Sequence, residues 1–188
     1  MIILKKMAML LVIVAGCLTP SSAGAQEKYI DKNGIVSFEA SEALFEPVKA
    51  TNKSVTAILN TETNEMAALA LMKSFRFKNS LMEEHFNENY IESETYPKAI
   101  FKGNLIDFDF SDLTESESEV AINGHIELRG KKKQISTIAK IHKVNDFVII
   151  KGSFMVSPDD FDIEIPSIVK SKIAEAITVS IDFKFSQK

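Results

Sequence analysis

The sequence predicts an all-β fold, built as an antiparallel sandwich or barrel, and three observations support this prediction. Apolar and polar residues alternate with a period of two along much of the chain, which is typical of strands with one buried face. Turn-forming residues separate many of these runs. Only two short segments have the spacing of a helix. The alternation leaves open whether the strands enclose a solid core or a cavity.

Two strand patterns are the longest and most regular. Apolar residues alternate with polar ones from Val120 to Leu128 and again from Ile177 to Phe185. A shift of one residue would turn every apolar side chain of these runs towards water, so their register is well specified. Shorter runs of the same kind span residues 36–40, 55–59, 75–77 and 101–105.

Turn chemistry predicts where strands end. The segments with such chemistry are Asn33-Gly34, Asn60–Asn64, Gly130-Lys131 and Val144-Asn145-Asp146. Residues 107–119 are acidic and rich in serine, which predicts an exposed loop. The only basic run, residues 131–133, follows a turn glycine and predicts a solvated hairpin, with attraction to a membrane surface as a weaker alternative.

Two segments are expected to be helical. Residues 80–90 begin with a capping serine and carry apolar side chains near helical spacing. Residues 167–175 follow Pro166, also begin with serine, and space their apolar residues along a turn and a half.

The first 25 residues have the pattern of an export signal. Lys5 and Lys6 precede an apolar run from Met7 to Leu18, and Ala23-Gly24-Ala25 offers the small residues that signal peptidase accepts. The run is shorter than the roughly 20 residues that span a bilayer, so no transmembrane span is expected. We therefore expect a signal peptide over residues 1–25 and a periplasmic or secreted domain over residues 26–188.

A second processing route is open at Cys17. Val14-Ala15-Gly16-Cys17 resembles a bacterial lipobox, in which Cys17 would carry a lipid and become the first residue of an anchored lipoprotein. The pattern favours cleavage after Ala25, because a Cys in an apolar segment is often only a small hydrophobic residue. Both routes place the domain outside the bacterial cytoplasm.

Composition excludes several functional classes. The net charge is −4, whereas phosphate binding needs a basic surface, so no nucleic-acid partner is expected. The single Cys excludes an internal disulfide and a zinc site built on several thiolates. The glycines form neither a Gly-x-Ser-x-Gly motif nor a phosphate-binding loop. We therefore expect neither an enzyme nor a cofactor.

The histidines give little support to a metal site. His85 and Glu88 lie three residues apart on a predicted helix, a spacing that occurs in metal sites. Further ligands would be needed, but His125 and His142 fall on the polar faces of strands. We therefore expect no metal, and a structural role for His85.

The stretch from Ser74 to Gly103 has a more specific pattern. After a strand that ends in Phe77 come Met82-x-x-His85-Phe86, Tyr90, and then Tyr96-Pro97-x-Ala99-x-Phe101. This pattern resembles the YceI-like family of exported bacterial lipid-binding proteins. Further matches are Gly124-x-Ile126-x-Leu128-x-Gly130, Asp160-Phe161-x-Ile163-x-Ile165-Pro166 and the closing strand 177–185.

The resemblance implies a lipocalin-like antiparallel barrel of eight strands, with one or two short helices near its mouth. It also implies that a long isoprenoid or quinone-like lipid lies inside the barrel, and family members often form homodimers. The chain departs from the family in three places. Residues 31–34 lack the usual histidine and tryptophan, Arg129 replaces a histidine before Gly130, and Phe161 replaces a tyrosine.

Alternation and the family's barrel together predict the ligand-binding residues. We expect the interior to be lined by Phe75, Phe77, Phe101, Leu105, Ile126, Leu128, Phe154, Ile181 and Phe183. The helical segments should line the mouth with Leu81, Met82, Phe86, Ile168 and Ile173. The expected function is a periplasmic carrier for an isoprenoid-type lipid, without covalent chemistry. The alternatives are a structural or interaction module with a filled core and, with less support, a hydrolase.

Overall fold

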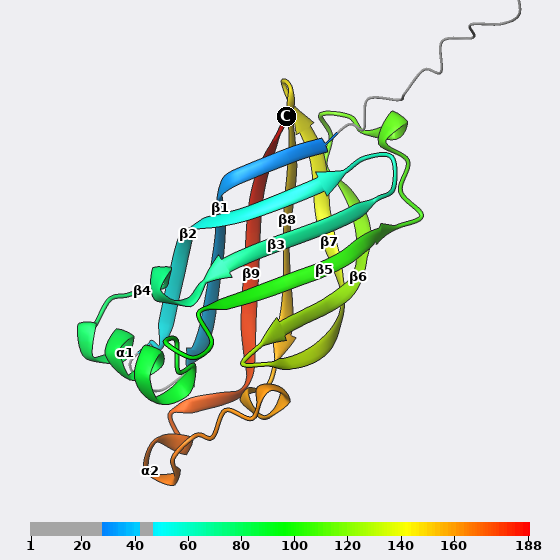
Figure 1. Cartoon of the computed structure of the whole chain (residues 1–188). Coiled ribbons are helices and arrows are strands. Elements are labelled where there is room, and N and C mark those ends of the chain that lie inside the picture. Colours follow the sequence, from blue (N-terminus) through cyan, green and yellow to red (C-terminus); the bar gives the residue numbers. More distant parts are fainter. Residues whose placement is uncertain (1–27, 42–46) are drawn as a thin grey trace, which may run out of the picture.

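Eight long strands form one antiparallel sheet that closes on itself (Figure 1). The computed structural model describes residues 28–41 and 47–188. Around the barrel the order is β1-β9-β8-β7-β6-β5-β3-β2, and pairing of β1 with β2 closes it. The strands are β1 (Lys28–Ser41), β2 (Lys49–Asn60), β3 (Glu65–Leu71), β5 (Lys98–Ile106), β6 (Ser118–Leu128), β7 (Lys131–Val144), β8 (Phe147–Val156) and β9 (Ile173–Gln187). The expected eight-stranded, lipocalin-like barrel is therefore confirmed.

Most of the short helical elements gather at one end of this barrel (Figure 1). The two-residue strand β4 (Arg76–Phe77) pairs with the start of β2 at the same end. The helical elements are η1 (Met72–Ser74), α1 (Ser80–His85), the π-helical turn η2 (Phe86–Tyr90), η3 (Phe110–Asp112), η4 (Pro158–Phe161) and α2 (Ser167–Lys170). No helix in the described part of the chain is long and apolar enough to cross a bilayer. The predicted leader, residues 1–25 with Cys17, lies outside the described residues.

The two predicted helices have different outcomes. The helix expected at residues 80–90 is present as α1 and η2, and the Asn79 side chain caps it by accepting the N–H of Leu81 at 2.9 Å. The helix expected at residues 167–175 is wrong in its second half, because α2 ends at Lys170 and β9 begins at Ile173. Ile173 pairs with Ser41 of β1, so the sheet ladder takes residues that helical spacing would have placed on α2.

The predicted turn at Asn33-Gly34 is also wrong. Both residues lie inside β1, whose pairing with β2 shifts register on either side of Gly34. The Asp31 carboxylate accepts the N–H of Asn33 at 2.8 Å and the N–H of Lys184 in β9 at 2.7 Å. The local turn chemistry of Asp and Asn therefore produces a β-bulge within a long strand rather than a hairpin.

Two other predicted turns are confirmed: Asn60–Asn64 joins β2 to β3, and Val144–Asp146 joins β7 to β8. The turn predicted at Gly130-Lys131 lies one residue earlier, because the β6–β7 hairpin turns at Arg129 and Gly130, with φ angles of 49° and 71°, and Lys131 is the first residue of β7. Two consecutive left-handed residues are typical of a tight two-residue hairpin. The loop predicted at residues 107–119 contains η3 but is two residues shorter than expected, because β6 begins at Ser118.

The end of the barrel away from α1 is solidly packed. Leu59, Ile141, Ile150 and Phe185 each have 0% of their surface exposed, and they come from β2, β7, β8 and β9. The β2–β3 and β7–β8 turns lie at this end (Figure 1). The ring centroids of Phe185 and Phe183 are 5.8 Å apart in an edge-to-face arrangement. Phe183 therefore borders the packed half of the barrel through its contact with Phe185.

Candidate ligand-binding cavity

The half of the barrel next to α1 and α2 encloses a cavity of about 520 Å³. This volume lies within the range of small-molecule sites. Its walls are almost entirely aliphatic and aromatic, and within residues 28–41 and 47–188 no Asp or Glu side chain lines it. The polar residues at its surface are His85, Tyr90, Thr137, Ser157 and Lys172. Such a site favours the apolar part of a ligand through removal of apolar surface from water.

Most of the predicted site residues line this cavity. They come from strands on all sides of the barrel and from both helical segments. They are Phe75, Phe77, Met82, Phe86, Phe101, Ile126, Leu128, Phe154, Ile173, Ile181 and Phe183. The period-two register that the sequence predicts for β5, β6 and β9 is therefore the register that directs these side chains inward.

Three predicted residues lie elsewhere. Leu105 points inward with 2% of its surface exposed, but it belongs to the packed core and does not line the cavity. Leu81 and Ile168 were expected at the mouth, and that placement is wrong: they are 54% and 84% exposed. On each helix the next residue, Met82 or Val169, lines the cavity instead, because successive helical residues point about 100° apart.

Sequence reasoning missed several lining residues. Four of them belong to predicted strands and point to the same side of the sheet as Ile181: Val36 and Phe38 on β1, and Ile177 and Val179 on β9. That alternation could have identified them. Met66, Ala68 and Ala70 of β3 were harder to identify, because Ala67, Leu69 and Leu71 on the outer face are apolar too. Phe161 and Ile163 lie outside the strands, where no periodicity indicates burial.

Four phenylalanines form the wall where α1 meets the barrel. Phe38, Phe75, Phe77 and Phe86 have ring centroids between 5.2 and 5.9 Å apart, in stacked, tilted and edge-to-face pairs. Such contacts contribute beyond the burial of area alone. The cluster therefore fixes η2, which directly follows α1, against β1 and β4 and gives the mouth of the cavity an aromatic side.

The opposite wall depends on two facing glycines. Gly103 of β5 pairs directly with Gly124 of β6. A Cβ at Gly103 would lie 2.4 Å from the carbonyl oxygen of Asn123, and a Cβ at either position would lie 2.7 Å from Cζ of Phe101. The ring of Phe101 therefore lies over the space that two side chains would otherwise fill.

Arg129 connects three segments around the mouth. Its guanidinium donates to the Glu92 carboxylate and to the carbonyl oxygen of Asp162, and it lies 5.7 Å from the ring centre of Tyr96. Glu92, Arg129 and Asp162 all have left-handed backbones, with φ angles of 53°, 49° and 54°. Non-glycine residues rarely adopt this conformation. One side chain thus ties together the loop after η2, the β6–β7 hairpin and the segment after η4.

A second ion pair holds η4 to the barrel. The ammonium of Lys133 lies 2.6 Å from the Asp160 carboxylate, which also accepts the N–H of Ser157 at 3.0 Å. The hydrogen bond from Lys133, and then that from Ser157, holds the pKa of Asp160 below its usual value. Of the basic run, Lys131 and Lys132 are exposed as expected and pair at the surface with Asp162 and Glu127, whereas Lys133 is only partly exposed.

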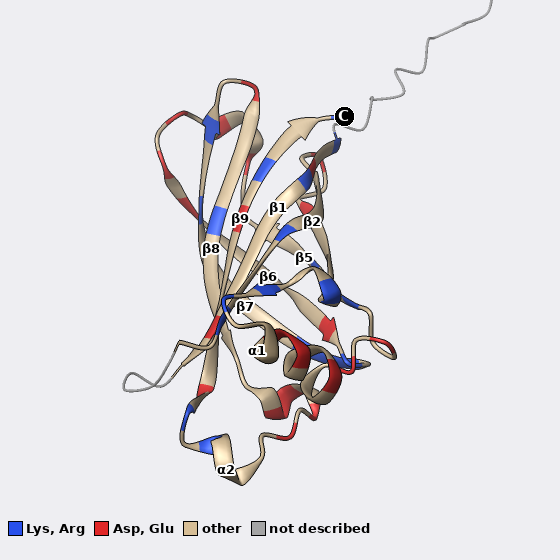
Figure 2. Cartoon of the chain, turned by 90° about the vertical axis from the view of Figure 1, so that its left-hand side faces the viewer, with Lys and Arg blue, Asp and Glu red and all other residues tan. Residues whose placement is uncertain are grey.

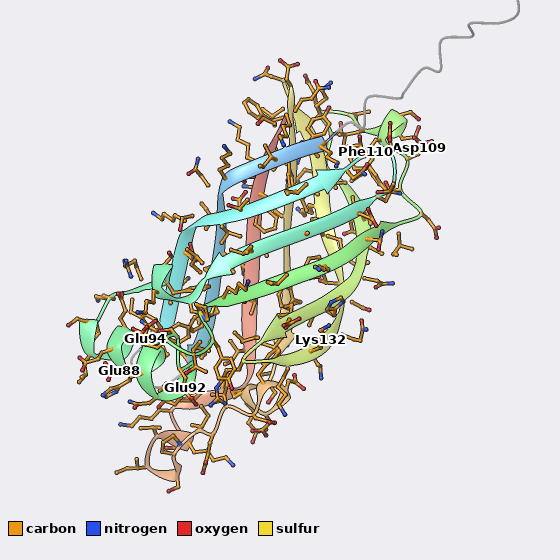
Figure 3. All side chains as sticks on the ribbon, viewed as in Figure 1. Glu88, Glu92, Glu94, Asp109, Phe110 and Lys132 are labelled. Atoms are coloured by element: carbon orange, nitrogen blue, oxygen red, sulfur yellow. The ribbon has the colours of Figure 1, made fainter. Side chains whose placement is uncertain are left out.

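The mouth is acidic on one side. Figure 3 shows Glu88, Glu92 and Glu94 together at the α1 end, whereas Asp109 and Phe110 lie at the packed end.

His85 is exposed and lies at the rim of the cavity. No group of three or more His, Cys, Asp or Glu residues within the described ranges could hold a metal ion.

The fold and the cavity define a class of protein: a small antiparallel barrel that encloses an apolar binding space at one end. The model of the YceI-like domain matches residues 29–185, and the chain therefore belongs to the YceI-like family. No curated protein matches the sequence.

Solved structures share the fold at low sequence identity. A polyisoprenoid binding domain from Saccharophagus degradans is 12% identical, with a TM-score of 0.74 over 87% of this chain and 99% of that one. BcnA of Burkholderia cenocepacia is 12% identical, with a TM-score of 0.66 over 80% and 95%. The YCEI protein of Campylobacter jejuni is 15% identical, with a TM-score of 0.62 over 78% and 88%. At these identities the similarity shows the fold alone.

Proposed function

We propose that this protein is a periplasmic carrier or store for a long-chain isoprenoid-type lipid, which it binds by apolar enclosure without covalent chemistry. The observation that carries the proposal is the cavity of about 520 Å³, in whose walls the described part of the chain places no carboxylate. The similar domain from Saccharophagus degradans, described as polyisoprenoid binding, supports the choice of ligand class.

The energetics of such a site suit a lipid tail. Burial contributes roughly 0.8 kcal/mol per methylene group, so ten methylenes would contribute about 8 kcal/mol before the cost of ordering the ligand. Enclosure of this kind needs no charged anchor. A quinone with an isoprenoid tail fits the same description, with its ring near the polar side chains of His85, Tyr90 or Lys172 at the cavity surface.

Location and assembly belong to the same proposal. We propose that residues 1–25 direct export and are removed after Ala25, and lipidation of Cys17 is the alternative route. We also propose a homodimer, because members of the family often form homodimers. The enclosed cavity favours a carrier over an interaction module with a filled core, since apolar binding space has no use in the latter.

Native mass spectrometry of the protein purified from its own source tests the proposal. A co-purifying lipid, identified after organic extraction, is the expected result. Titration of the delipidated protein with farnesol and with a short-tailed ubiquinone then measures affinity directly. A protein that carries no lipid and takes up neither probe would contradict the proposal and favour the interaction module.

A further inference from the structure

Ile168 is the most exposed large apolar side chain of the described residues, at 84% of its surface. Single exposed apolar residues are common, so exposure alone has little weight. Its position adds weight, because α2 projects beyond the barrel at the mouth end and forms the outermost part of that end (Figure 2). An apolar side chain at the tip of a projection can insert into an apolar environment, such as the interior of a bilayer, without a clash between that environment and the rest of the molecule.

The charges beside Ile168 are positive. Lys170 and Lys172 are exposed on the same short segment, and neither forms an ion pair within the described ranges. The α1 side of the mouth is acidic, whereas Lys170 and Lys172 are the charged residues of the tip itself, and the acidic Glu164 and Glu175 lie on the chain that leads into and out of it (Figure 2). An anionic surface that touches the tip would therefore meet the two lysines beside Ile168, whereas it would repel the α1 side of the mouth.

The same segment also forms part of the cavity wall. Val169, Lys172 and Ile173 line the cavity, whereas Ile168 points away from it. The backbone bonds of the tip are local: Val169 donates to Pro166 at 2.9 Å and Lys172 donates to Val169 at 2.8 Å. A surface that touches Ile168 would therefore lie directly beside the mouth of the binding space.

We propose that α2 docks the protein on an anionic lipid bilayer, with Ile168 among the acyl chains and Lys170 and Lys172 at the phosphates. This inference rests on the proposed function, since a lipid carrier must meet a bilayer to load and unload. One apolar side chain and two lysines provide weak, reversible attachment. A carrier that has to leave the membrane with its cargo needs attachment of that kind.

Vesicle flotation tests the docking. The full chain is expressed in a Cys17→Ser background, so that no lipid is attached at that position. Vesicles of phosphatidylcholine with phosphatidylglycerol are compared with vesicles of phosphatidylcholine alone. We expect Ile168→Ser and Lys170→Glu each to reduce binding to the anionic vesicles about five- to tenfold. The matched controls are Ile138→Ser and Lys143→Glu, which alter an exposed residue on the outer face of β7 and an exposed residue at its far end, away from α2, and which should bind like the parent.

Uptake of farnesol in the absence of vesicles, measured on the same proteins, separates the two proposals. Ile168→Ser should take up the probe like the parent while failing to float. Docking is overturned if Ile168→Ser floats like the parent, or if phosphatidylglycerol has no effect. It is also overturned if the parent does not float and Ile168→Ser changes the oligomeric state, because the tip is then a protein contact. If the parent floats through Ile168 but takes up no probe, the proposed function fails and the docking surface stands.

Discussion

The ring of Phe183 in β9 lies directly against Gly34 in β1, so closely that a Cβ on residue 34 would lie 2.6 Å from Cδ1 of that ring. Phe183 is 1% exposed, lines the inner end of the cavity and contacts Phe185 of the packed core. The bulge at Gly34 thus makes room for the side chain that separates the filled half of the barrel from the hollow half.

Gly34→Ala should therefore destabilise the protein. The new methyl group would overlap the Phe183 ring and approach the carbonyl oxygen of Val55 at 3.1 Å. Overpacking of this kind costs about 1–3 kcal/mol, measurable as a lower urea midpoint. The same substitution in a Phe183→Leu background should cost less, since the smaller side chain can move aside. Equal costs in both backgrounds would show that the ring is not the obstacle.

Phe101 and Phe185 should respond differently to truncation. Phe185→Ala removes a ring from a fully packed site and should cost about 3–5 kcal/mol. Phe101→Ala enlarges a cavity that already exists, so its cost should be clearly smaller, while affinity for farnesol falls roughly tenfold. Urea unfolding and calorimetric titration measure the two effects. If Phe101→Ala binds farnesol as tightly as the parent, Phe101 is not part of the binding wall.

Phe101→Asp gives a sharper version of the same test. An isolated carboxylate in an apolar space is costly unless it is protonated or reached by water. Because the space beside Phe101 is a cavity, we expect a folded protein with sharply reduced lipid binding. Circular dichroism reports the fold, and aggregation or unfolding of this variant would argue for a solid interior instead.

Arg129→Met should loosen the mouth. It removes charge-assisted hydrogen bonds to Glu92 and to the Asp162 carbonyl, at a cost of about 2 kcal/mol. Arg129→Lys should restore only part of this, because one ammonium cannot reproduce the planar fork of a guanidinium. Lys131→Met is the control: Lys131 also contacts Asp162, at 2.5 Å, but it is half exposed and should contribute little. Limited proteolysis between residues 157 and 172 should be faster in Arg129→Met alone.

The Lys133–Asp160 pair should make stability depend on pH in the acid range. The pKa of Asp160 is lowered in the folded state, so its contribution is complete above the usual Asp pKa of 3.8. The contribution is lost as the pH falls below that value through the folded pKa. Asp160→Asn should therefore be less stable than the parent at pH 7, and the gap should close as the pH falls towards 2. A gap that stays constant with pH would mean that the charge of Asp160 does not matter.

Processing of the N-terminus is tested by intact mass and terminal sequencing after export. We expect Gln26 as the new first residue. A chain that begins with a lipid-modified Cys17 would replace this prediction with the lipoprotein route and leave the location outside the cytoplasm unchanged.

Where apolar and polar residues alternate, the sequence by itself determined the strand and the side that it turns inward. A strand has a period of two, so Val120–Leu128 and Ile177–Phe185 specify their buried faces without any knowledge of the neighbouring strands. Wall residues on these strands, such as Ile126, Leu128 and Ile181, follow from this period, whereas the helix at residues 80–90 follows from its capping residue and its helical spacing. The resemblance to the YceI-like family could also be seen in residues 74–103, because it depends only on the order and spacing of residues along the chain.

Only the tertiary structure decided where the interior is hollow. Leu105 and Phe101 share one face of β5, yet the first packs in the core and the second lines the cavity, because this difference depends on what the other strands place opposite them. Tertiary contacts also decide the conformation at Gly34. Its sequence is typical of a turn, but it forms a bulge because β9 places the Phe183 ring against it and the N–H of Lys184 against the Asp31 carboxylate. Ile168 and Val169 are adjacent and equally apolar, and only the position of α2 at the mouth turns one towards the cavity and the other outward.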